Sequence, residues 1–175
     1  MISFGIDFGT TNSIMALAKN TTAEVKTIPF YDRENRLPHP SIVWYSNQQV
    51  IVGREAKNHF NAYVEESGNK FVKSIKSHIA DSKQIDIFGR KVYPYSIAGE
   101  IFKYLKTYAE KEYSTELDES IKEAVVSIPI SFNGLQREAL RRAANKAGIH
   151  IKTFIHEPFA AIIWFLNSRN DLFSQ

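Results

Sequence analysis

Short apolar runs separated by polar turns dominate the start of the chain. Residues 2–8 and 14–18 are apolar runs joined by a glycine-led tetrad at residues 9–12, and this arrangement predicts an antiparallel hairpin. Residues 23–28 add a third expected strand. Folds of the Rossmann type lead instead from the first strand directly into a helix. The opening of the chain therefore predicts a three-strand antiparallel meander.

The middle of the chain alternates short strands with short helices. Proline, asparagine and charged residues throughout residues 29–40 predict a loop. Apolar residues at positions 71, 72, 75 and 79 have helical spacing, which predicts a helix over residues 71–79. Further expected elements are hairpins over residues 41–52 and 84–93 and a helix over residues 53–60.

Helices and strands alternate in the last third of the chain. A long apolar stripe predicts a helix over residues 97–113, with Ser96 as its N-cap. Two apolar runs, residues 124–128 and 151–155, predict strands. The remaining expected elements are a helix from Asn133 to Ala147, followed by Gly148 as its C-terminal glycine, and a last helix from Glu157.

This order of elements predicts an α/β fold with a mixed sheet, the ribonuclease-H-like half of the actin fold. Three meander strands come first, an inserted α+β block follows, and strand–helix–strand–helix completes the chain. We expect residues 1–30 and 116–175 to form the core subdomain and residues 31–115 to form the inserted α+β subdomain. The assignment rests on analogy of topology.

The amino-acid composition and the charge of the chain exclude several classes of function. The 175 residues include no cysteine, which excludes disulfides and thiolate metal sites. The net charge of +3 comes from scattered basic residues, so no nucleic-acid surface is expected, and the histidines have no metal-ligand spacing. The longest apolar run, residues 159–166, is far shorter than the about 20 residues that span a bilayer. Without a signal-peptide pattern, the protein is expected to be cytoplasmic, with no membrane contact.

One constellation near the N-terminus carries chemistry. Strand alternation places Asp7 on the opposite face from Ile6 and Phe8, and the following turn offers backbone N–H groups and two threonine hydroxyls to an anion. A carboxylate beside such a turn would repel phosphate unless a divalent metal and its waters lie between them. The alternative interpretation is a tight hairpin with polar turn residues.

The same residues resemble a known family. Residues 5–13, GIDFGTTNS, match the opening phosphate motif of the DnaK-type heat-shock chaperone family almost letter for letter. Further segments resemble family motifs in the same order, so the resemblance covers nearly the whole chain. These segments are NRLPHPSIV (35–43), GREAKN (53–58), VVSIPISFN (125–133), QR (136–137) with AG (147–148), and IHEPFAA (155–161).

The resemblance implies the first lobe of an actin-like ATPase domain. Its implied cofactors are ATP or ADP and Mg²⁺, with K⁺ as an accompanying ion, and its implied partners are co-chaperones and peptide clients. The implied site consists of Asp7 and Glu157 as catalytic residues that hold the metal through water, Gly9, Thr10, Thr11 and Asn12 as phosphate-binding residues, and Pro129 and Arg137 as an allosteric relay. Without the resemblance, Glu157 is an acidic residue favoured at a helix N-terminus, Pro129 is a strand stop and Arg137 is a surface arginine.

The family also uses a catalytic lysine directed at the γ-phosphate, and two registers supply one. The usual pattern is Lys-Arg-Leu-x-Gly. Starting at Lys73 gives KSIKS, with isoleucine for leucine and serine for glycine, whereas starting at Lys76 puts His78 at the leucine position. We therefore prefer Lys73 and keep Lys76 as the alternative. Either lysine could instead be a solvated helix residue.

The chain also departs from the family pattern. His156, Phe159 and Ile130 replace asparagine, threonine and alanine, and residues 71–77 resemble divergent members that lack a peptide-binding domain. Alternative classes are an actin-like filament-forming ATPase, a sugar kinase of the same fold and a non-catalytic nucleotide-binding interaction module. Residues 11–13 favour the chaperone branch over the filament proteins.

The family's second phosphate loop, Asp-x-Gly-Gly-Gly-Thr, is expected after the last helix, and the sequence ends before it. We therefore expect a fragment of a longer protein. A single loop without an adenine pocket should show no appreciable ATPase activity and at best roughly millimolar nucleotide binding. The last helix is apolar on every side over residues 159–166, so self-association through this helix is expected.

Overall fold

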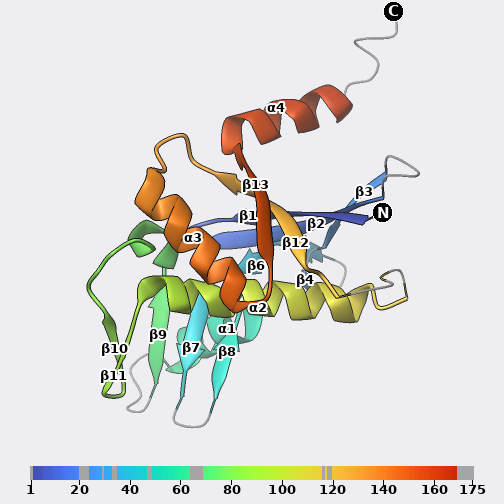
Figure 1. The fold of residues 1–175 in the computed structure, drawn as a ribbon. Helices are drawn as coiled ribbons and strands as arrows, with labels where there is room; N and C mark the ends of the chain where they lie inside the picture. Colours follow the sequence, from blue (N-terminus) through green and yellow to red (C-terminus); the bar gives the residue numbers. More distant parts are fainter. Residues whose placement is uncertain are drawn as a thin grey trace, which may run out of the picture.

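A mixed five-strand sheet with a short sixth strand forms the centre of the protein in the computed structural model (Figure 1). The structure describes residues 2–19, 24–28, 30–32, 35–46, 49–63, 69–115, 117 and 120–168. The sheet order is β13-β12-β1-β2-β3, with β6 paired to β2. The strands are β1 (Ile2–Phe8), β2 (Asn12–Lys19), β3 (Glu24–Ile28), β6 (His39–Pro40), β12 (Glu123–Ile128) and β13 (His150–His156).

The pairing directions agree with the expected fold. β1, β2 and β3 pair antiparallel, whereas β1, β12 and β13 run parallel. The predicted three-strand meander and mixed sheet are therefore confirmed. The parallel neighbours β12 and β13 are connected through helix α3 (Gly134–Lys146), as parallel neighbours require a crossover.

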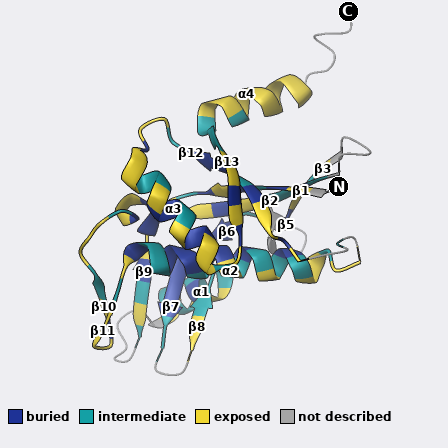
Figure 2. Cartoon of the chain, viewed as in Figure 1, coloured by how far each residue is buried: buried dark blue, intermediate teal, exposed yellow. Residues whose placement is uncertain are grey.

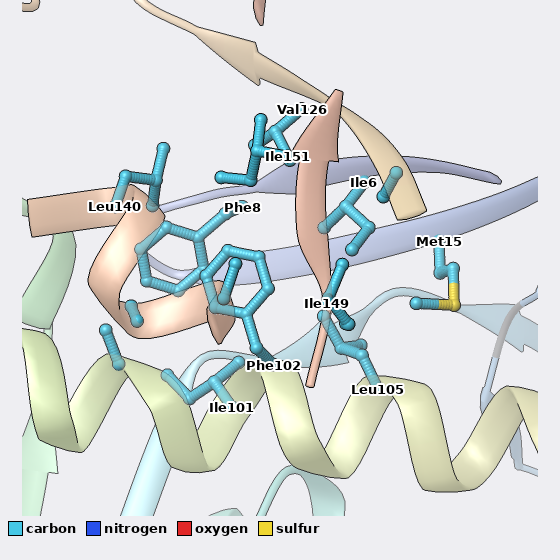
Figure 3. Packing of buried hydrophobic residues seen from close by; sticks show 14 of the residues in the cluster. Ile6, Phe8, Met15, Ile101, Phe102, Leu105, Val126, Leu140, Ile149 and Ile151 are labelled. Atoms are coloured by element: carbon cyan, nitrogen blue, oxygen red, sulfur yellow. The ribbon is translucent and has the colours of Figure 1, made fainter. Parts of the chain in front are cut away.

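One face of this sheet is the main core face. Phe4, Ile6 and Phe8 alternate with the exposed Ser3 and Asp7, as the period of two along a strand requires. The buried side chains meet helix α2 (Pro94–Glu112) and α3, and the rings of Phe8 and Phe102 lie 5.1 Å apart (Figure 3). Asp7 is thereby held on the face opposite to this core, as predicted.

Helix α2 lies between the main sheet and a second, three-strand sheet (Figure 1). Val43 and Val72 of the second sheet belong to the same buried cluster as Phe102 of α2, so the core is continuous across both sheets. The second sheet has the order β8-β7-β9 and packs on α1. Its strands are β7 (Ile42–Tyr45), β8 (Val50–Val52) and β9 (Lys70–Lys73), and helix α1 (Arg54–Tyr63) lies between β8 and β9 in sequence. A separate hairpin of β10 (Ile85–Ile87) and β11 (Arg90–Val92) follows along the chain.

The predicted helix over residues 71–79 is wrong. Strand β9 continues to Lys73, Ser74 turns the chain with φ of 56°, and a 3-10 helix, η1 (Ile75–His78), follows. The spacing of the apolar residues fits this arrangement as well. Val72 is buried as part of strand β9, whereas Ile75 is buried at the start of η1 and Ile79 directly after its end. Pairing of β9 with β7 supplies hydrogen bonds that local spacing does not reveal.

Two other boundaries also differ from the predictions. Residues 29–40 are not simply a loop, since they include β4 (Phe30–Asp32), β5 (Asn35–Leu37) and β6. Helix α2 begins at Pro94, so Ser96 lies inside it and Tyr93 is the N-cap residue. Proline is favoured in a first turn because its missing N–H would have no helical partner there.

The C-terminal elements follow the predicted pattern. Asn133 and Gln136 form a capping box at the start of α3, and Gly148 has a φ of 69° after its end. Helix α4 (Glu157–Ser168) extends away from the sheet, and its apolar side chains, including Trp164 at 71% exposure, are open to solvent (Figure 2). Among the described residues, no helix is both long and apolar enough to cross a membrane.

Candidate functional site

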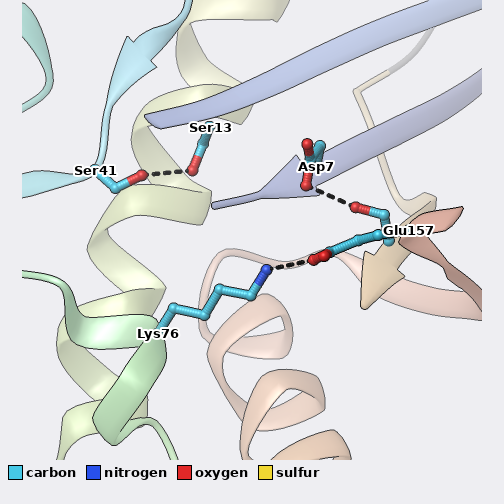
Figure 4. Close-up of polar contacts among 6 residues, drawn as sticks. Asp7, Ser13, Ser41, Lys76 and Glu157 are labelled. Carbon is cyan, nitrogen blue, oxygen red and sulfur yellow. Dashed lines mark hydrogen bonds and ion pairs between the residues drawn. The ribbon is translucent and has the colours of Figure 1, made fainter. Parts of the chain in front are cut away.

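The carboxyl ends of the parallel strands bring the predicted acidic residues to one edge of the main sheet. Asp7 stands near the end of β1, in register with Ser127 of β12, and Glu157 follows directly after β13. The Ser127 hydroxyl donates a 2.7 Å hydrogen bond to Oδ1 of Asp7 (Figure 4). The carboxylate of Asp7 is therefore fixed by a neighbouring strand and still exposed.

The turn after β1 is tight, and hydrogen bonds with Ser41 hold it in place. A Cβ atom at Gly9 would overlap the carbonyl oxygen of Asn12, so only glycine fits there without a shift. The Ser41 N–H donates a 2.8 Å bond to the Thr11 carbonyl, and the hydroxyls of Ser13 and Ser41 lie 2.8 Å apart in a buried contact (Figure 4). Thr10 and Thr11 remain exposed on this rigid turn.

A buried lysine completes this edge. Lys76 Nζ donates a 2.7 Å hydrogen bond to Oε1 of Glu157, and the two side chains are 7% and 39% exposed (Figure 4). The same ammonium group lies 5.7 Å from the centre of the Phe132 ring. A lysine is rarely this buried unless a carboxylate partner compensates for lost hydration. The structure thus brings Lys76 to Glu157.

Lys73, the lysine preferred from the sequence, lies elsewhere. Its Nζ stands 4.0 Å above the ring of Phe60, and its side chain is exposed. It lines a cavity together with Thr10 and Thr11. The left-handed turn at Ser74 separates the two lysines, and the geometry favours Lys76 for the position beside Glu157. A sequence signal for this choice was the serine itself, a residue typical of turns.

The two predicted relay residues, Pro129 and Arg137, both hydrogen-bond to Phe132, which lies between β12 and α3. The Phe132 N–H donates a 3.1 Å bond to the Pro129 carbonyl, and Arg137 Nε donates a 3.2 Å bond to the Phe132 carbonyl. The ring of Phe132 is in turn the one beside Lys76. Pro129 and Arg137 are therefore linked to the buried lysine through a single residue that sequence reasoning missed.

Strand β6, which braces the turn, contains a buried histidine. His39 Nε2 donates a 2.9 Å bond to the Ile28 carbonyl, and its Nδ1 lies 3.0 Å from the Tyr104 hydroxyl. Desolvation lowers the pKa of His39, and the hydrogen bond to the Ile28 carbonyl opposes that shift. Burial also raises the pKa of Tyr104 far above its ordinary value. His39 is thus a neutral, structural part of the support near neutral pH.

The carboxylates at this sheet edge suit a metal ion that is held through water better than one that is bound only by protein side chains. Within the described ranges no three histidine, aspartate or glutamate side chains gather as a metal cage. Asp7 and Glu157 are the carboxylates at the strand ends, and Lys76 already occupies one oxygen of Glu157. Mg²⁺ usually keeps several waters and binds through one or two carboxylates together with phosphates. These residues therefore fit water-mediated Mg²⁺ and do not fit an all-protein metal site.

The family model described as Hsp70 protein matches residues 3–170. The chain belongs to the Hsp70 family. The match includes every strand end and turn of the site described above, so the family resemblance of the sequence motifs is confirmed, together with the mixed α/β fold expected of an Hsp70 ATPase lobe.

Several Hsp70-family relatives are similar along almost the whole chain. "Chaperone protein DnaK" of Mycoplasma mobile is 35% identical over 167 residues, which are 95% of this chain and 26% of the relative. "Chaperone protein DnaK" of Metamycoplasma hominis is 34% identical over 161 residues, or 92% of this chain and 25% of the relative. The chain thus spans about a quarter of the length of these curated relatives.

Proposed function

We propose that this chain is the first, ATP-binding lobe of a DnaK-like chaperone ATPase. One observation carries the proposal: Asp7, the turn from Gly9 to Asn12 and the Lys76–Glu157 pair converge on the same sheet edge. Carboxyl ends of parallel strands are the usual place for ligands in open α/β sheets. ATP or ADP with Mg²⁺, and K⁺ as an accompanying ion, are the proposed cofactors.

Each residue has a proposed role in this site. The backbone N–H groups of Gly9 and Thr10 and the hydroxyls of Thr10 and Thr11 would hold phosphate oxygens. Asp7 and Glu157 would hold Mg²⁺ through water, and the ion, when bound, supplies charge neutralisation for phosphoryl transfer. Lys76, in place of Lys73, would stabilise charge at the γ-phosphate and hold Glu157 in position.

Glu157 is suited to act on the attacking water. Its Oε1 accepts a hydrogen bond from Lys76, which restricts rotation of the carboxylate. The half-exposed side chain can accept a proton through its second oxygen, Oε2. Catalysis by the site would therefore consist of positioning and electrostatics, as phosphoryl transfer generally requires.

The remaining roles are proposals for the longer protein. Pro129 and Arg137 would transmit the nucleotide state, since the Phe132 turn joins them to Lys76. Co-chaperones and peptide clients are the proposed partners, and the cytoplasmic location stays a prediction. Self-association through α4 is supported by the exposed Phe159, Ile162 and Trp164.

Hydrolysis by the natural full-length protein tests the proposal. We expect Mg²⁺-dependent turnover of ATP that is lost in Glu157→Gln and retained in a matched control, Glu138→Gln, on the exposed face of α3. Titration calorimetry of the 175-residue chain with ATP and Mg²⁺ should show at best millimolar binding. Turnover that is equal in both variants would contradict the proposed site.

A further inference from the structure

A cavity of about 320 Å³ lies between helix α2 and strand β8 of the second sheet (Figure 1). None of the described residues that line it belongs to the Asp7–Lys76–Glu157 site or to the turn at residues 9–12. We propose that this cavity binds a small amphipathic anion, namely a carboxylate with an aromatic or branched apolar body. The lining residues that carry the proposal are Val50, Val52, Lys103, Tyr104, Tyr108 and Lys111.

Helix α2 supplies one wall of the cavity. Lys103, Thr107 and Lys111 are spaced i, i+4 and i+8, so they follow one line along the helix, and Tyr104 and Tyr108 follow the line beside it. The buried residues of α2 occupy other positions. This wall therefore remains outside the core and is open to a ligand.

Strand β8 supplies the other wall, which is apolar. Val50 and Val52 point to the same side of the strand, because side chains alternate and Ile51 between them packs on a separate buried cluster. Val50 is 46% exposed, so part of this wall is in contact with water. The rings of Tyr104 and Tyr108 lie 6.1 Å apart and add aromatic surface. A ligand with an apolar body would remove this surface from water, which favours binding.

The charges of the lining select an anion. Lys103 and Lys111 are exposed, and in the part of the chain that the structure describes neither ammonium group has a carboxylate partner. The lining also includes Glu100, but its Oε1 lies 3.1 Å from Nζ of Lys146 on α3, so its charge is already compensated. The surplus of positive charge attracts a carboxylate and repels a cation. The volume is at the lower end for small-molecule sites, which suits a compact ligand.

The cavity also contacts the support of the turn at residues 9–12. The Tyr104 hydroxyl lies 3.0 Å from Nδ1 of His39, and the Tyr108 ring stands edge-on to the His39 ring at 4.7 Å. His39 is in turn paired with Ser13 between β6 and β2. A ligand that packs on the two tyrosine rings would therefore shift the signals of the His39 ring as well.

Titration of the 175-residue chain with 3-phenylpropionate, at constant ionic strength, tests the proposal. We expect saturable amide chemical-shift changes at Val52 and Thr107, which lie in the two different walls. Two comparison ligands separate the contributions of charge and apolar body. The neutral 3-phenylpropanamide should bind about twofold to fivefold more weakly, because it lacks the charge. Propionate should bind about tenfold more weakly or worse, because it lacks the ring.

Variants of the lining test the same two contributions. Lys103→Gln and Lys111→Gln should each weaken 3-phenylpropionate binding by about twofold to fivefold, whereas Lys91→Gln, in the β10–β11 hairpin, is the control and should bind normally. Val50→Asp and Val50→Asn are a matched pair that differ in charge at the cavity wall. The aspartate variant should bind the carboxylate more weakly than the asparagine variant, and both should bind the amide equally. The amide spectrum of each variant shows whether it is folded.

Two outcomes would overturn this carboxylate site. One is the absence of saturable changes at Val52 and Thr107 with 3-phenylpropionate. The other is saturable binding that Lys103→Gln, Lys111→Gln and Val50→Asp all leave intact in folded protein, which would place the ligand elsewhere on the chain.

Discussion

Lys76 and Glu157 are 81 positions apart in sequence, yet their side chains meet in a 2.7 Å charge-assisted hydrogen bond. The lysine comes from the short helix after β9, and the glutamate from the first turn of α4. Lys76 is almost fully buried, and among the described residues Glu157 is the carboxylate that pairs with its ammonium group. The contact links the segment after β9, an edge strand of the second sheet, to the segment after β13, an edge strand of the main sheet.

The first prediction compares the two lysines. Lys76→Ala should reduce ATP hydrolysis by the natural full-length protein by about 10²–10³-fold, which is typical for loss of one electrostatic group in a site. Lys73→Ala should reduce it by much less, because Lys73 does not contact Glu157. Single-turnover rates measure both effects. A larger loss of ATP hydrolysis in Lys73→Ala than in Lys76→Ala would indicate that Lys73, the lysine preferred from the sequence, is the catalytic one.

Asp7 is expected to matter for chemistry more than for folding. Asp7→Asn keeps an oxygen that can accept the Ser127 hydroxyl, so the thermal midpoint should change little. Mg²⁺-dependent hydrolysis should fall by about 10²-fold or more, because the amide cannot replace the charge facing the metal's waters. Ser127→Ala is the companion variant and should have a smaller effect. Normal hydrolysis by Asp7→Asn would remove Asp7 from the proposed site.

The turn at Gly9 gives a prediction on stability. Gly9→Ala should lower the free energy of unfolding by about 1–3 kcal/mol, because the new Cβ would force the turn away from Asn12. Gly134→Ala is the control, since a Cβ there meets nothing within 4 Å. Urea unfolding of the 175-residue chain measures both. Equal stability of the two variants would show that the turn relaxes without cost.

Burial of His39 predicts a pH dependence of stability. The folded pKa of His39 lies below its ordinary value of 6.5, so the unfolded chain binds the proton more readily. The contribution of His39 is therefore complete above pH 6.5 and is lost as the pH falls from 6.5 towards the folded pKa. Urea unfolding at pH 7.5 and 5.5 should show a smaller loss in His39→Gln than in the natural sequence. The same loss in both would exclude His39 as the cause.

The exposed apolar surface of α4 predicts self-association of the chain. Trp164→Ser should weaken concentration-dependent association in sedimentation experiments, because Trp164 is the most exposed of the large apolar side chains on α4. Leu135→Ser, a similarly exposed leucine on α3, is the control and should leave association unchanged. A monomer at all concentrations would contradict this prediction.

Much of the fold could be predicted from local patterns. The alternation at Ile6 and Phe8 identified β1 and the face of Asp7, and Asn133 identified the start of α3, because both signals lie within a few residues. The segment around Ser74 could not be assigned in this way. Its strand is stabilised by pairing with β7, and its apolar spacing fits a helix equally well.

The candidate site was partly visible for the same reason. Asp7 and the glycine turn form a contiguous motif, so the sequence alone pointed to them. Ser127 and Lys76 could not be connected to their partners, because each contact joins segments 120 or 81 positions apart. The choice between Lys73 and Lys76 depended on the backbone conformation of one serine, and no spacing rule determines that conformation.

Helix α2 determines how the molecule can unfold. Its residue Phe102 packs on Phe8 of the main sheet, while the Tyr104 ring lies against Gly53 beside the second sheet. Opening either interface would therefore expose a side of the same helix to water. The slowest-exchanging amides of both sheets should share one opening free energy, that of global unfolding, although β12 of the main sheet lies far from β3 in sequence.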